Sequence, residues 1–122
     1  MSKDTDRIKK RISFRSCNTE YLVSADKIIR IDIEDDLLSA EIINDERLEK
    51  IHLASTLKTY EDKLYGFGFV RVNHQTLVNV KFISRIKAIK RQRLIMLNNI
   101  EIAVSRRKWP VLKQFIEQWC VN

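Results

Sequence analysis

The residues best suited to chemistry in this chain are the cations of its C-terminal half. From residue 69 onward there are eleven Lys or Arg and two Glu, a net charge of +9, whereas residues 1–68 carry twelve Lys or Arg and fourteen Asp or Glu, a net charge of −2. Ten of these eleven cations lie in residues 69–109, FVRVNHQTLVNVKFISRIKAIKRQRLIMLNNIEIAVSRRKW, among strand-forming apolar residues. One end of the fold is therefore expected to attract a polyanion, and nucleic acid is the first candidate.

These cations also have a purely structural interpretation. Those at residues 85–91 could simply form the exposed face of a strand, because exposed strand faces are ordinarily charged. The run at residues 106–108 is harder to explain in this way, because it lies where a helix is expected to begin and the helix dipole favours acids there. Such a break of a local rule often marks a functional segment.

No arrangement of residues in the sequence predicts catalysis or metal binding. His52 and His74 have no Cys, Asp or Glu around them at metal-ligand spacing. The acidic residues at 32–36 lack the spacing and the distal Glu of a calcium loop, so a solvated acidic turn is expected there. The phosphate-binding patterns GxxxxGK and GxGxxG do not occur. We therefore expect no enzyme, no metal and no cofactor.

The length of 122 residues is that of one domain, expected at residues 11–122 after a flexible polar lead-in at residues 1–10. No apolar run approaches the roughly 20 residues that span a bilayer, and the charged N-terminus lacks the apolar stretch of a secretory signal. We expect a cytoplasmic protein with no membrane insertion. In that reducing compartment Cys17 and Cys120 are expected to be free, inert thiols.

Short alternating segments predict strands through the N-terminal half. They are expected at residues 11–16, 21–24, 27–33, 37–43 and 48–54, with turn-like residues between them. The alternation fits an antiparallel meander buried on one face. Ser55 can then cap a short helix near residues 56–64, in which Leu57, Tyr60 and Leu64 share one face.

The C-terminal half continues as strands and closes with a helix. Strands are expected at residues 69–72, 77–80, 84–91, 93–97 and 100–104. Asn98 and Asn99 tolerate the positive φ values of a two-residue hairpin turn. Ser105 can cap a helix near residues 106–119, although Pro110 is compatible with a start a few residues later. The predicted fold class is mainly β, with small antiparallel sheets and two helices.

The segment FVRVNHQTLVNVKFI resembles the LytTR-type DNA-binding domain, a family of response-regulator output domains. In that family an aromatic residue, an Arg, a short polar loop, an aliphatic pair and an Asn precede an Ile that starts the next strand. The matching residues here are Phe69, Arg71, Leu77, Val78, Asn79 and Ile83. STLKTYEDKL is similar to the family's short helix, and AVSRRKW followed by Leu112 is similar to its closing segment. The resemblance covers residues 11–117 and includes no receiver domain.

The resemblance implies an elongated arrangement of small sheets and a bacterial transcription regulator that inserts loops into the grooves of duplex DNA. It implies base contacts from Asn73, His74, Arg106 and Arg107, and Asn and Arg are suited to pair with adenine and guanine. The cations expected to hold phosphates, which fix register without reading sequence, are Lys81, Arg91, Arg93 and Lys108. Arg71 is expected to support the loop, and the two Trp residues, 109 and 119, are expected in the core.

The chain departs from the family pattern in two places. His74 and Gln75 stand where a basic residue and a Ser are usual, and Thr76 stands where a large apolar residue is usual, so the target sequence is expected to differ. The family's other groove-facing loop corresponds to residues 33–36, which are acidic here, and phosphates repel carboxylates. We carry over no DNA contact at that loop.

Three functions remain open on the sequence alone. The first is a sequence-specific regulator that binds direct repeats in duplex DNA and is either free-standing or part of a longer protein. The second is a protein-interaction module controlled by a membrane-bound or other regulatory partner. The third, RNA binding, is disfavoured because single-strand binders expose stacking aromatics, whereas the aromatics here fall at core-like positions.

Overall fold

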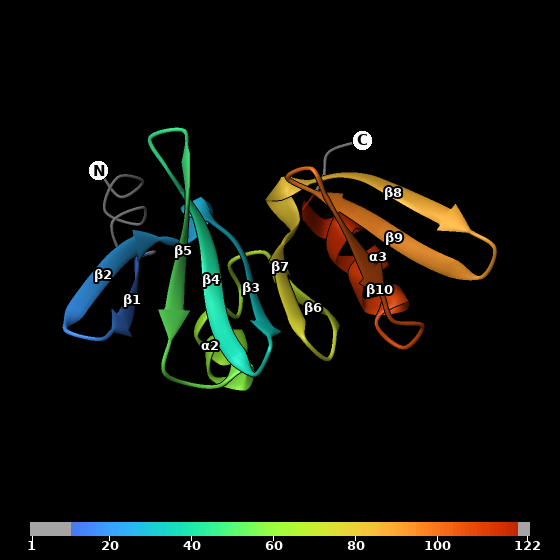
Figure 1. The fold of residues 1–122 in the computed structure, drawn as a ribbon. Coiled ribbons are helices and arrows are strands. Elements are labelled where there is room, and N and C mark those ends of the chain that lie inside the picture. The colour runs from blue at the N-terminus through green and yellow to red at the C-terminus, as the bar shows by residue number, and fades with distance from the viewer. Residues whose placement is uncertain (1–10, 120–122) are drawn as a thin grey trace.

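The computed structural model describes residues 11–119, which fold into three small antiparallel sheets arranged side by side (Figure 1). The expected flexible lead-in at residues 1–10 and the thiol of Cys120 lie outside the described residues. Cys17 is a free, exposed thiol. The predicted mainly-β class with two helices and its elongated arrangement of sheets is confirmed. No helix within residues 11–119 is long and apolar enough to cross a membrane.

The central sheet has five strands in the order β5-β4-β3-β7-β6. Its strands are β3 (Ile28–Glu34), β4 (Leu37–Asn44), β5 (Arg47–Leu53), β6 (Phe69–Asn73) and β7 (Thr76–Asn79). Of the five strands expected in one meander, only β3, β4 and β5 form it, whereas the strands at residues 11–16 and 19–24 pair with each other in a separate sheet. The hairpin of β6 and β7 adds to the meander because β7 pairs with β3. This pairing places the 73–75 loop beside the end of β3, where the Ile33 N–H donates to the Gln75 carbonyl at 2.9 Å.

Two further sheets flank the central one. β1 (Arg11–Ser16) and β2 (Thr19–Ser24) form a hairpin on one side, and β8 (Ile83–Ile89), β9 (Gln92–Leu97) and β10 (Ile100–Val104) form a three-stranded sheet on the other. Asn98 and Asn99 turn between β9 and β10 with φ of 49° and 70°, as predicted. The turns at residues 35–36 and 45–46 also have positive φ at both positions, which suits two-residue hairpins.

Each helix covers its own hydrophobic core. α2 (Leu57–Lys63) packs on the first core, where the Tyr60 ring lies 5.5 Å from the Phe14 ring between centroids. Its cap is Thr56, whose hydroxyl accepts from the Thr59 N–H at 3.2 Å, so the prediction of Ser55 was wrong by one residue. The Thr56 backbone is extended, the conformation that a capping residue requires.

The C-terminal helix begins later than residue 106. α3 spans Trp109–Trp119. Residues 106–108 form a turn before it, and the Ser105 hydroxyl closes this turn by accepting from the Lys108 N–H at 3.2 Å. The cations at 106–108 therefore precede the helix. α3 covers the second core through buried Leu112 and partly buried Trp109, but Trp119 is 51% exposed, so its expected core position was wrong.

Two short 3-10 turns join the sheets. η1 (Ala25–Lys27) precedes β3, and η2 (Val80–Phe82) follows β7. The Asn79 side chain connects them: its amide donates to the Ile28 carbonyl at 3.0 Å, and its carbonyl accepts from the Lys81 N–H at 3.1 Å. The second core, formed by residues of β6, β7, β9, β10 and α3, holds the three-stranded sheet against the central one.

Candidate nucleic-acid interface

A groove of about 1000 Å³ opens where three separate segments meet. The segments are the 73–75 loop between β6 and β7, residues 89–93 around the β8–β9 turn, and residues 103–106 at the end of β10, with Trp109 at the start of α3. Five of the predicted DNA-contacting residues line it: Asn73, His74, Arg91, Arg93 and Arg106. Residues up to 36 positions apart in the sequence therefore share one surface.

A second hollow, of about 580 Å³, adjoins the first. It is lined by Arg107 and Lys108, the other two cations of the predicted site near this end, and by Lys58 of α2. His74 and Ser105 line both hollows, so the 73–75 loop forms the rim between them. The His74 side chain is exposed and makes no hydrogen bond with another described residue.

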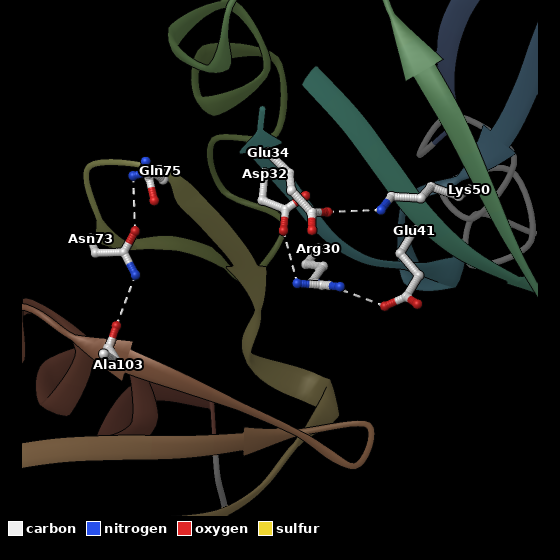
Figure 2. Close-up of polar contacts among 8 residues, drawn as sticks. All are labelled: Arg30, Asp32, Glu34, Glu41, Lys50, Asn73, Gln75 and Ala103. Atoms are coloured by element: carbon white, nitrogen blue, oxygen red, sulfur yellow. Dashed lines mark hydrogen bonds and ion pairs between the residues drawn. The ribbon is translucent and has the colours of Figure 1, made fainter. Parts of the chain in front are cut away.

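The loop that carries His74 is held by contacts to its backbone. The Arg71 guanidinium donates to the His74 carbonyl at 2.8 Å and forms an ion pair with Glu61 at 3.3 Å. The predicted supporting role of Arg71 is confirmed. The Asn73 side chain accepts from the Gln75 N–H at 2.8 Å and donates to the Ala103 carbonyl at 2.8 Å (Figure 2). A rigid loop with a free side chain at its tip suits recognition, because little ordering is then needed on binding.

Four arginines around the two hollows have no neighbouring acid that would neutralise their charge among the described residues. Arg91, Arg93, Arg106 and Arg107 have no acidic partner within salt-bridge distance among residues 11–119. The Arg93 guanidinium lies over the Trp109 ring, 4.8 Å from its centroid, and forms a cation–π contact with it. Unpaired cations around a hollow raise the local concentration of anions.

Lys81 is separated from the other predicted phosphate contacts. It lies on η2, at the far end of β7 from the 73–75 loop, and a four-residue strand spans about 13 Å. Its ammonium lies 3.4 Å from the Asp26 carbonyl and 3.8 Å from the Asp26 carboxylate. It lines a different cavity, near Trp119 at the end of α3. The structure therefore does not bring Lys81 into the groove.

The acidic hairpin turn at residues 33–36 begins at Ile33, which bonds to the 73–75 loop, but none of these four residues lines the groove. Arg30 forms ion pairs with Asp32 at 2.8 Å and Glu41 at 3.1 Å, and Lys50 pairs with Glu34 at 3.0 Å (Figure 2). Burial raises the pKa of the Asp32 carboxyl above its ordinary value, although Arg30 opposes the change. Within residues 11–119 no cluster of His, Cys, Asp or Glu could hold a metal ion.

The predicted site missed two cations, Lys90 and Lys58. Lys90 has a positive φ of 58° at the β8–β9 turn and lines the groove beside Arg91. Its place between two predicted strands was the available signal. Lys58 of α2 could not have been found from sequence, because only the packing of the helix against the sheet brings it near Arg107.

Fold and groove together define a small β-rich domain that presents a well-held loop and, within the described residues, cations without acidic partners. Residues 18–117 match the family model of the LytTr DNA-binding domain. The chain belongs to this family, and the predicted membership is confirmed. The family indicates DNA binding by a response-regulator output domain. It is a family of DNA-binding domains rather than of enzymes.

The fold is similar to a solved structure, the LytTr DNA-binding domain of a Bacillus cereus protein described as a methyl-accepting/DNA response regulator. The two are 16% identical with a TM-score of 0.72, and the match covers 88% of this chain and 96% of that chain. A comparison with curated protein sequences found no match.

Proposed function

We propose that this chain is a bacterial transcription regulator that binds duplex DNA and selects its sequence through His74 and the cations after β10. The observation that carries the proposal is the meeting of His74 and Arg106 on one groove, whose cations have no acidic partner among residues 11–119. The major groove of B-DNA, about 12 Å wide, admits such loops. An exposed imidazole and a guanidinium can both donate to base edges.

The remaining groove cations are proposed to hold the DNA backbone. Arg91 and Arg93 lie on one side of His74, and Lys108 lies on the other, in the second hollow. Arg107 can reach either a base or a phosphate from that hollow. Contacts to phosphates on both sides of a recognition loop fix its depth and register, while the loop itself reads the bases. Lys81 is left out of this proposed set because of its position.

The first test is selection of bound duplexes from a random library at about 0.15 M salt with nonspecific competitor. We expect a short motif to be enriched, and two copies of the chain on direct repeats would appear as the motif repeated near one helical turn. Failure of the folded protein to enrich any motif would contradict the proposal. It would favour instead a cytoplasmic interaction module controlled by a protein partner.

The second test removes the proposed reading groups one at a time. His74→Ala and Arg106→Ala should each lose about 1–3 kcal/mol on the selected site and little on random DNA. His52→Ala and Arg47→Ala are matched controls, because both are exposed residues on β5 and outside the groove. Equal losses on both DNAs would reject base reading, and losses in the controls of the same size would reject the location of the site.

A further inference from the structure

Both polar atoms of the Asn73 amide form hydrogen bonds to backbone groups of the protein. Its oxygen accepts from the Gln75 N–H, and its nitrogen donates to the Ala103 carbonyl, each at 2.8 Å (Figure 2). Recognition of adenine by Asn uses this same oxygen and nitrogen together. Each of these atoms has one hydrogen-bonding position left, so any base contact would have to be made by a side chain whose orientation the two internal bonds already set.

The bond to Ala103 joins the two segments that carry the proposed reading groups. Asn73 precedes His74, and Ala103 lies three residues before Arg106. A second link runs between the same segments, because the Ser105 N–H donates to the Val72 carbonyl at 2.9 Å. These contacts join the edge of the central sheet to β10 of the three-stranded sheet, so they set the position of one reading segment relative to the other.

We propose that Asn73 is a positioning residue, which links the 73–75 loop to the 103–106 segment. This link holds His74 and Arg106 at a fixed position relative to each other when they contact DNA. The inference rests on the proposed function of the groove, and it replaces the predicted base contact of Asn73. The Gln75 bond shapes the turn, because an Asn oxygen that accepts from the N–H two residues on forms an Asx-turn. The Ala103 bond sets the distance between the two segments.

Two substitutions separate these bonds. Asn73→Ala removes both, whereas Asn73→Ser keeps a hydroxyl that can accept from the Gln75 N–H but is too short to reach Ala103. Asn44→Ala is the matched control, because Asn44 is exposed and its amide also makes one bond across a turn, to Glu49 at 3.1 Å.

The first measurement uses no DNA. In hydrogen exchange followed by NMR, Asn73→Ala should speed exchange of the Gln75 and Ser105 amides by about tenfold, and Asn73→Ser should affect Ser105 more than Gln75. Asn44→Ala should change neither. Unchanged exchange at both amides in Asn73→Ala would overturn the proposal, whatever the chain does on DNA.

The second measurement is a double-mutant cycle on the selected duplex. Asn73→Ala should weaken binding about tenfold in the wild-type background, mainly through faster dissociation, with an unchanged salt slope. In a His74→Ala, Arg106→Ala background the same substitution should reduce the affinity by less than about threefold, because the two side chains that Asn73 positions are then absent.

An undiminished loss in that background, with relaxed preference at a single base pair, would show that Asn73 reads DNA directly and would overturn the proposal. If the wild-type chain selects no DNA sequence, the proposed function fails separately, and the exchange data alone decide whether Asn73 holds the two segments together.

Discussion

Asn79 is expected to be the polar residue on which the stability of this fold depends most. It is 3% exposed and lies at the end of β7, where the central sheet meets both 3-10 turns. Its amide donates to the carbonyls of Ile28 and Ala25 at 3.0 and 3.4 Å, and its oxygen accepts from the Lys81 N–H at 3.1 Å. We consider the substitution Asn79→Ala, which removes all three contacts.

The expected loss follows from the backbone groups that remain without a partner. A buried polar group that loses its hydrogen bond costs about 1–3 kcal/mol. The Ile28 carbonyl should contribute most, whereas the Ala25 carbonyl keeps the bond that it accepts from the Ile28 N–H, and the Lys81 N–H is partly accessible to water. We therefore expect the free energy of unfolding to fall by about 3 kcal/mol, which corresponds to a drop in Tm of about 10 °C in a domain of this size.

Urea denaturation followed by circular dichroism measures this loss. Asn79→Ala should lower the midpoint with an unchanged slope, since neither state changes its compactness. The control Asn44→Ala, which removes an exposed bond, should stay within about 0.5 kcal/mol of wild type. A loss in Asn79→Ala no larger than in this control would refute the reasoning, because it would mean that water satisfies the freed groups.

Two further predictions concern charge. Arg93→Ala should lower the slope of log affinity against log salt by about one, measured on the selected duplex. Lys81→Ala should leave this slope unchanged, because Lys81 lies outside the groove. Equal reductions in the two variants would show that Lys81 does contact a phosphate. The Ser24 hydroxyl, which donates to Asp26 at 2.6 Å, lowers the pKa of Asp26 below its ordinary value of 3.8, and Lys81 adds to the effect. This stabilisation is present above pH 3.8 and is lost as the pH falls through the lower folded value, so Asp26→Asn should reduce the free energy of unfolding at pH 6 but not at pH 2. Urea titrations at the two pH values test this, and an equal difference at both would contradict the assignment.

Local sequence signals predicted most of the elements but not their exact ends. The pair Asn98 and Asn99 marked a hairpin turn because these residues tolerate positive φ, and both adopt it. The start of α3 was less well defined, because Ser105 closes a turn before the helix rather than the helix itself. Ser55 and Thr56 both have side chains suited to capping. The cap is the residue that is still extended directly before the helix begins, and in the structure this is Thr56.

The candidate site was predicted in its residue types more than in its assembly. Arg71 was expected to support the loop, and its bond to the His74 carbonyl bears this out. The engagement of Asn73 with Ala103 could not be foreseen, since it crosses between two sheets and joins residues thirty positions apart. The same limit applied to Lys81, which has the sequence surroundings of a DNA-contacting residue but lies beside Asp26.

By itself the sequence determined the β-rich class, the order of the elements, the family pattern and the concentration of positive charge after residue 69. These properties depend on alternation, turn residues and composition, which act over a few neighbouring residues. The tertiary structure decided which cations share one groove, which polar side chains are free to meet DNA and which are consumed in holding loops. Those outcomes depend on the pairing of β7 with β3 and on the packing of two cores, and both join residues that are distant in the chain.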